Sequence, residues 1–152
     1  MFFIGVITNQ KNEIYVKNEL NEENILFIND KTISNMKNIK FEAIVIDNKI
    51  NNRNDFRKIL TNTKYVILNS DIEFDLEVIK GLDITIIIYG FNSKSTFTVS
   101  SLTENNIIIC LQRIISKPNG EKIEPEEYQL KNEENTEKYA IIFTQILKEL
   151  YE

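Results

Sequence analysis

Residues that could bind a phosphate group follow the first apolar segment of the chain. Gly5 is followed by Thr8-Asn9-Gln10-Lys11, and a lysine in such a turn could contact an anion. A phosphate-binding loop of the G-x-x-x-x-G-K-[ST] type needs a second glycine, which exposes backbone amides, and a hydroxyl that binds Mg²⁺. Positions 10 and 12 are Gln and Asn instead. The turn has only the outline of such a loop, and Lys11 is its one candidate nucleotide-binding residue.

The sequence predicts no catalytic residue and no metal ligand. The chain has no His, which excludes His-based triads and His-ligated zinc. Cys110 lies in an apolar run with no His to lower its pKa, so we expect a buried structural thiol. Acidic residues cluster in polar sequence, where burial would not separate their pKa values as acid–base catalysis requires; they are Glu121, Glu124, Glu126, Glu127, Glu133, Glu134 and Glu137.

A third acidic group follows the fourth apolar segment. Asp71, Glu73 and Asp75 alternate with other residues, which could suggest a magnesium site. On a helix, however, positions i, i+2 and i+4 do not share one face. Ser70 and Glu73 match a capping box, so we expect a helix that begins at Ser70 and ends at Gly81. Its apolar face would consist of Ile72, Leu76 and Ile79, and only Asp71 keeps a candidate functional role.

Composition limits the class of protein. The 152 residues are 42% hydrophobic and 27% charged, with a net charge of −5. The apolar fraction favours a folded domain, and no apolar run approaches the length of a membrane span. The acidic balance argues against nucleic acid as a partner. The start of the chain lacks the basic region of a signal peptide, and the lone Cys110 fits a reducing compartment, so we expect a cytoplasmic protein with no membrane partner.

Short apolar runs alternate with helical patterns over the first ~90 residues, as in a parallel sheet flanked by helices. The expected strands are 2–7, 25–28, 41–46, 65–68 and 84–89. We expect a helix at 13–20, a helical turn at 32–37 and a helix capped by Asn54 or Asp55.

The pattern changes after residue 90. Segments 95–101, 107–115 and 123–130 read as an antiparallel meander, with a turn at Pro118-Asn119-Gly120 and Pro125 marking an edge strand. A last helix, opened by Asn135, carries an apolar stripe that should pack on the sheet. The stripe consists of Tyr139, Ile142, Phe143, Ile146, Leu147 and Leu150. The sequence thus predicts a single α/β domain over 1–152: a three-layer Rossmann-like parallel sheet of about five strands, then an antiparallel meander and a C-terminal helix.

Residues 64–150 resemble the later half of the central domain of the Mur ligases. These enzymes are the ATP-dependent amide ligases of bacterial peptidoglycan synthesis. The resemblance is carried by the strand end Asn69-Ser70-Asp71 and, further on, by the strand that ends in Tyr89-Gly90-Phe91. It implies that Asn69 and Asp71 hold the adenine and ribose of a nucleotide. The family's second Asp is replaced by Ile72, and the complete phosphate loop, the central His and the separate substrate and C-terminal domains of the family are missing.

Without tight binding of phosphate and Mg²⁺, phosphoryl transfer loses its main electrostatic stabilisation. The sequence therefore favours a non-catalytic binding or regulatory domain, a pseudoenzyme without a cofactor and linked to cell-wall metabolism. Its partner would be a protein, a small nucleotide-like ligand or a cell-wall precursor. The sequence also leaves open that the protein forms a homo-oligomer. The alternative is a nucleotide-dependent enzyme subunit whose site is completed by a partner chain. A flavodoxin- or receiver-like signalling domain is a third hypothesis, although the first strand ends without an acidic pair or a phosphate loop.

Overall fold

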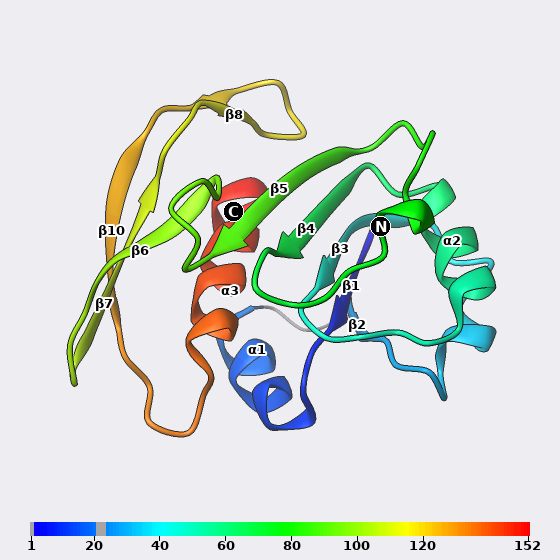
Figure 1. Ribbon diagram of the computed structural model, residues 1–152, viewed down its shortest axis with the longest axis horizontal. Helices are drawn as coiled ribbons and strands as arrows, with labels where there is room; N and C mark the ends of the chain where they lie inside the picture. Colours follow the sequence, from blue (N-terminus) through cyan, green and yellow to red (C-terminus); the bar gives the residue numbers. More distant parts are fainter. Residues whose placement is uncertain (1, 21–23) are drawn as a thin grey trace.

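An eight-stranded sheet in the order β10-β7-β6-β5-β4-β3-β1-β2 forms the centre of the protein. The computed structural model describes residues 2–20 and 24–152 (Figure 1). The first five strands run parallel, so their carboxyl ends lie along one edge of the sheet. They are β1 (Phe3–Ile7), β2 (Ile25–Phe27), β3 (Phe41–Ile46), β4 (Tyr65–Asn69) and β5 (Thr85–Gly90).

The rest of the sheet is the expected antiparallel meander. It consists of β6 (Phe97–Leu102), β7 (Asn106–Leu111) and the edge strand β10 (Glu126–Lys131). β6 runs parallel to β5 but pairs with it only at Tyr89–Phe97 and Gly90–Thr98. Between β7 and β10, the strands β8 (Ile115–Ser116) and β9 (Lys122–Ile123) form a separate hairpin.

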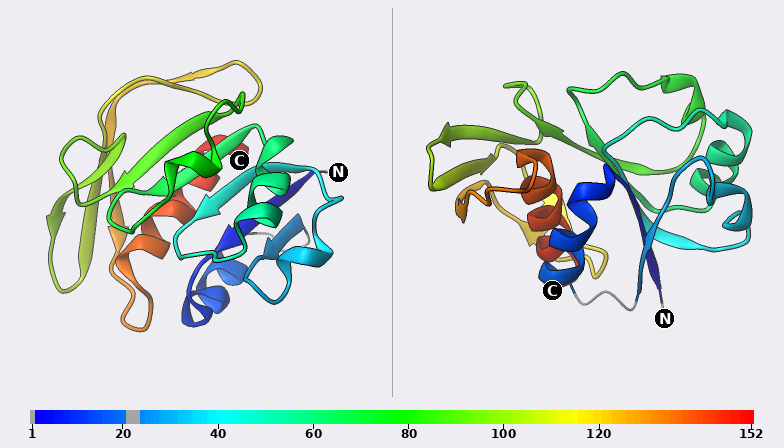
Figure 2. Two further views of the ribbon diagram at one scale, coloured as in Figure 1. Left: turned by 45° about the vertical axis from the view of Figure 1, so that its right-hand side comes forward. Right: turned by 90° about the horizontal axis from the view of Figure 1, so that it is seen from below.

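Helices cover both faces of the parallel region, as a parallel sheet requires. The helices α1 (Glu13–Glu19) and α3 (Lys138–Tyr151) lie side by side on one face, and α2 (Arg53–Thr61) covers the other (Figure 2). Among the described residues, short 3-10 turns lie at η1 (Gln10–Asn12), directly before α1, at η3 (Ile33–Asn35), between β2 and β3, and at η4 (Leu76–Val78), between β4 and β5. The expected fold class, a Rossmann-like α/β sheet followed by a meander and a C-terminal helix, is confirmed.

The apolar stripe of α3 packs on the sheet, as expected. Its residues Ile142, Phe143, Ile146, Leu147 and Leu150 are buried in one core with strand residues of β1, β3, β4, β5, β6 and β7, and Tyr139 lies partly buried beside them. The helix begins at Lys138, with Glu137 as its N-cap, rather than at Asn135. The second core, on the other face, surrounds Phe56, Ile59 and Leu60 of α2, which Asn52 caps in place of Asn54 or Asp55.

The prediction of a helix from Ser70 to Gly81 is wrong. Only η4 forms there, and Asp75 caps it by accepting from the Glu77 amide at 3.0 Å. The residues of the expected capping box have other partners, since the Ser70 hydroxyl lies 3.0 Å from that of Ser95. The Asp71 carboxylate accepts from the Phe91 amide at 2.8 Å. These long-range contacts hold residues 70–75 as a turn and a short loop at the carboxyl edge of the sheet.

Candidate functional site

Polar side chains from four neighbouring strand ends meet around one carboxylate. Asp47, directly after β3, is 7% exposed. It accepts hydrogen bonds from the Thr8 hydroxyl (2.8 Å), the Asn69 amide (3.0 Å) and the Tyr89 hydroxyl (2.7 Å). These donors follow or end β1, β4 and β5, so the four residues, called here the strand-end network, tie four strands together at their carboxyl ends.

The electrostatics of the strand-end network follow from its burial. No cation is paired with Asp47 among the described residues, and all three of its donors are neutral. Burial raises the pKa of Asp47, against the effect of the three hydrogen bonds, which lower it. Burial and the neighbouring Asp47 carboxylate also raise the pKa of Tyr89 well above its usual value. Each of the three donors is already committed to Asp47.

The turn after β1 is filled by a carboxylate of the chain itself. Glu137 accepts from the side-chain amides of Asn9 (2.6 Å) and Asn12 (2.9 Å), and its backbone amide donates to Asn12 (3.2 Å). Burial raises the pKa of Glu137, but these hydrogen bonds and the charge of Lys11 outweigh it and leave the pKa lowered. The groups that a phosphate would approach at this turn therefore already hold an anion. The crevice between β1 and β3, where ligands of doubly wound sheets commonly bind, is also bridged, because Asn48 donates to Asn9 at 2.9 Å.

Asn69 and Asp71 belong to a second set of contacts. Asn69 is 1% exposed, and its side-chain oxygen accepts from the Asp71 amide at 2.8 Å. The exposed Asp71 carboxylate accepts from the Tyr139 hydroxyl at 2.9 Å and from the Phe91 amide at 2.8 Å. Burial and this carboxylate raise the pKa of Tyr139 to about 12. Gly90 lies against them with φ +148°, and a Cβ there would come within 2.8 Å of the Asp71 carboxylate, so only glycine fits.

An open cavity of about 620 Å³ lies beyond the carboxyl ends of β3 and β4; we call it the edge cavity. Its floor includes apolar side chains of Ile50, Phe56, Phe74 and Val78, and its rim carries two cations and two carboxylates. The charged lining residues are Lys49, Arg53, Glu73 and Asp75. This size and this mixture of an apolar floor with a few polar groups are typical of sites for small molecules.

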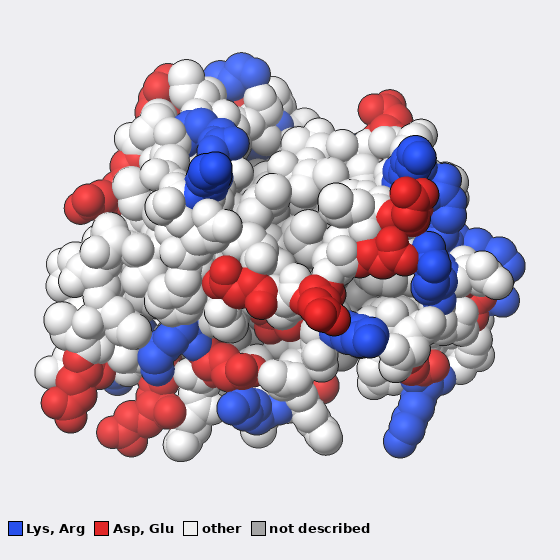
Figure 3. All heavy atoms as spheres, viewed as in Figure 1, with Lys and Arg blue, Asp and Glu red and all other residues white. Residues whose placement is uncertain are grey.

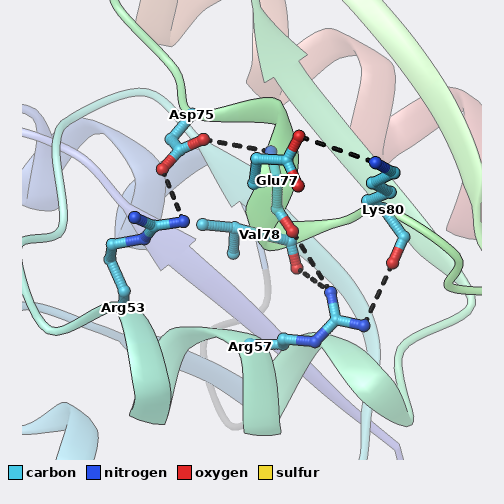
Figure 4. Close-up of polar contacts among 6 residues, drawn as sticks. All are labelled: Arg53, Arg57, Asp75, Glu77, Val78 and Lys80. Carbon is cyan, nitrogen blue, oxygen red and sulfur yellow. Dashed lines mark hydrogen bonds and ion pairs between the residues drawn. The ribbon is translucent and has the colours of Figure 1, made fainter.

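Two arginines of α2 shape the edge cavity (Figure 4). Arg57 donates to the backbone carbonyls of Glu77 (3.3 Å), Val78 (2.9 Å) and Lys80 (3.0 Å), which fixes the turn around η4 against the helix. Arg53 forms an ion pair with Asp75 at 2.8 Å across the rim. Since a guanidinium presents its donors in a rigid fork, Arg57 holds one wall of the cavity in place without lining it.

The structure brings two of the three sequence-predicted site residues together and separates the third. Asn69 and Asp71 are joined by a hydrogen bond, whereas Lys11 lies exposed in η1 beside Glu137. None of the three lines the edge cavity in the described part of the chain. Sequence reasoning missed Asp47, for which the only signal was an Asp directly after an apolar strand, and it missed Lys49, Arg53 and Phe74.

The comparisons with known proteins give no family. No model of a known protein family matches the chain, and no curated protein does either. Among the described residues there is no cluster of three or more His, Cys, Asp or Glu side chains that could hold a metal ion. In residues 2–20 and 24–152, no helix has the length and hydrophobicity needed to cross a bilayer. The site must therefore be interpreted from its own geometry.

Proposed function

We propose that this chain is a non-catalytic binding domain that takes a small nucleotide-like ligand in the edge cavity. The observation that carries the proposal is the lining of this cavity, where exposed cations stand next to an apolar floor at the carboxyl edge of a parallel sheet. Phe74 and Ile50 offer an apolar surface for a planar base. Lys49 would attract a phosphate, and Glu73 can accept hydrogen bonds from sugar hydroxyls, while Arg53 and Asp75 stay paired with each other beside them.

Binding without catalysis is supported by how the other polar groups are used. The donors of the strand-end network point at Asp47, and the turn after β1 holds Glu137, so neither offers free groups to a transferring phosphate. Phosphoryl transfer depends on positioned charges around that group. The resemblance to the Mur ligase central domain supports the same ligand class and a role in cell-wall metabolism. In this proposal Asn69 and Asp71 position the loop at 70–75 instead of contacting the ligand.

A thermal-shift experiment tests the proposal. Purified protein is heated with AMP, ADP, ATP, UDP or a uridine-diphosphate sugar. A nucleotide at ~100 times its Kd should add about 2.7 kcal/mol of stability. Lys49→Glu, which reverses an exposed charge on the rim, should abolish the shift. The matched control Lys40→Glu lies just before β3, at the opposite edge of the sheet, and should leave the shift unchanged.

Two outcomes would refute the proposal. Either no nucleotide raises the melting temperature of the wild-type protein, or Lys49→Glu responds as strongly as the wild type. A shift that Lys40→Glu removes to the same extent would show a general charge effect and would also refute a site in the edge cavity.

A further inference from the structure

The three edges of the sheet are protected to very different degrees. A sheet edge presents unpaired N–H and C=O groups, and proteins commonly shield it with short strands, charges or proline. The outer strand β2 has only three residues, and β10 follows Pro125 and carries Glu126, Glu127 and Lys131. A third, shorter edge arises within the sheet, because β6 pairs with β5 only at its last two residues and leaves the first four residues of β5 without a neighbouring strand on that side. This edge carries no charged residue and no proline.

The backbone of β5 is open on the side that faces β6. The Thr85 amide donates to Lys64 at 2.9 Å, and the Tyr89 carbonyl accepts from Ser70 at 2.8 Å, both on the side of β4. Because alternate residues of a strand direct their backbone groups to alternate sides, Ile86 and Ile88 direct theirs toward β6. In the described chain β6 pairs with β5 only at Tyr89 and Gly90. The Tyr89–Phe97 pairing engages the Ile88 carbonyl, so the open groups are the amide and carbonyl of Ile86 and the amide of Ile88.

The side chains along this edge are apolar and β-branched. Ile86 is 40% exposed and Ile88 is 37% exposed, whereas Ile87 and Tyr89 on the other face are buried under α3. The exposed pair lies on the face that α2 covers further along the sheet, but α2 does not reach β5 (Figure 1). The surface in front of β5 carries no Lys, Arg, Asp or Glu side chain (Figure 3). This surface has no charge for a charged partner to pair with.

We propose that the open edge of β5 binds an extended, uncharged segment of another protein, which adds to the sheet as a strand. The amide and carbonyl of Ile86 and the amide of Ile88 would form ladder hydrogen bonds, and the side chains of both residues would contact alternate side chains of the added segment. Such strand addition obtains affinity from the main chain and specificity from alternate side chains. The β-branched, half-exposed residues Ile86 and Ile88 suit a pleated surface that another strand completes. This surface is distinct from the edge cavity, which lies beyond the ends of β3 and β4.

The experiment uses an acetylated and amidated octapeptide of alternating valine and threonine as its probe. The matched control peptide has the same side chains, but every second amide is N-methylated and cannot donate. Binding to the intact protein is followed by amide NMR and by hydrogen exchange. The first peptide should shift the amide signals of Ile86 and Ile88 and slow their exchange by at least about tenfold, and the N-methylated peptide should do neither.

Two variants distinguish binding at the open edge of β5 from nonspecific binding to exposed apolar residues. Ile88→Lys places a charge on the edge and should weaken binding of the peptide by at least about tenfold, with an unchanged melting temperature. Ile14→Lys is the control, because Ile14 is an equally apolar, 71% exposed residue on α1. It should bind the peptide like the wild type.

The proposal is overturned if the N-methylated peptide binds equally well, if Ile88→Lys has no effect, or if the shifted amides belong to β2 or β10. It is also overturned if the protein alone forms a dimer that Ile88→Lys dissociates, since a second copy would then be the occupant.

Discussion

Replacement of Asp47 by asparagine should change how the stability of the protein depends on pH. Asp47 is buried, accepts three hydrogen bonds and has a pKa raised above its ordinary value of 3.8 by burial. A carboxyl group whose pKa is raised on folding stabilises the folded protein fully only below its unfolded pKa. This contribution is lost as the pH rises through the folded pKa. The amide side chain of the D47N variant cannot ionise, so that variant escapes the loss.

The sizes of the effects follow from the contacts. Asp47→Ala leaves the buried Tyr89 hydroxyl and the buried Asn69 amide without their acceptor, at about 1–3 kcal/mol each, or about 2–6 kcal/mol together. Thr8 is partly exposed, so water can replace its partner. Asp47→Asn keeps an acceptor for Tyr89 and Asn69, and we expect it to lie within about 1 kcal/mol of the wild type at about pH 4. A pKa difference of one between folded and unfolded chains corresponds to about 1.4 kcal/mol.

Urea unfolding of the wild type, D47N and D47A between about pH 4 and about pH 8 measures these differences. D47N should gain stability relative to the wild type as the pH rises, then keep a constant advantage above the folded pKa of Asp47. A difference that does not depend on pH would mean that the carboxyl group has an ordinary pKa. A wild type that gains on D47N as the pH rises would mean that the hydrogen bonds outweigh burial. Either result would refute the reasoning.

Four further predictions concern the core, the cavity wall, the carboxyl edge and the turn after β1. Phe143→Ala, in the centre of α3, should cost about 3–5 kcal/mol in denaturant unfolding, and a folded mutant of unchanged stability would contradict its place in the core. Arg57→Ala removes three hydrogen bonds to the turn around η4 and should lower stability by about 1–3 kcal/mol, with Arg57→Lys only a partial replacement. Burial and the Asp71 carboxylate together raise the pKa of Tyr139 to about 12. Asp71→Asn removes the carboxylate but not the burial, so ultraviolet titration should show a pKa that is lower but still raised; an unchanged value would mean that burial alone is the cause. The purified protein should not hydrolyse ATP with or without Mg²⁺, and steady turnover abolished by Lys11→Ala would refute this.

Most of the fold could be predicted because the strands of a parallel sheet are buried on both faces and appear as short apolar runs. The runs that contain Ile44, Ile67 and Ile87 show this directly, since all three residues are buried in the strands. The stripe of α3 has helical spacing and was equally informative. The start of α3 could not be predicted from local sequence. Glu137 is the N-cap of the helix, and it contacts Asn9 and Asn12, which are 128 and 125 residues away in the sequence.

Long-range contacts also explain the wrong helix at 70–81. Ser70 and Glu73 have the local spacing of a capping box, but the Ser70 hydroxyl contacts Ser95 and Asp71 holds Phe91 and Tyr139. Local spacing does not reveal competition from residues distant in the chain. The same limit applies to the candidate site. The strand-end network joins residues that are 22 to 42 positions from Asp47 in the sequence, and the edge cavity depends on where Arg57 holds the turn around η4.

Amide NMR of the wild-type protein during titration with the nucleotide that stabilises it most tests the proposed function most directly. If the edge cavity binds the ligand, the largest shifts will fall on residues 48–56 and 73–78 and will saturate with one site. Lys49→Glu will remove these shifts and leave the rest of the spectrum unchanged. Shifts centred on Lys11 and the turn after β1, with the cavity residues unaffected, would contradict the proposal and return the phosphate site to the place that the sequence first suggested.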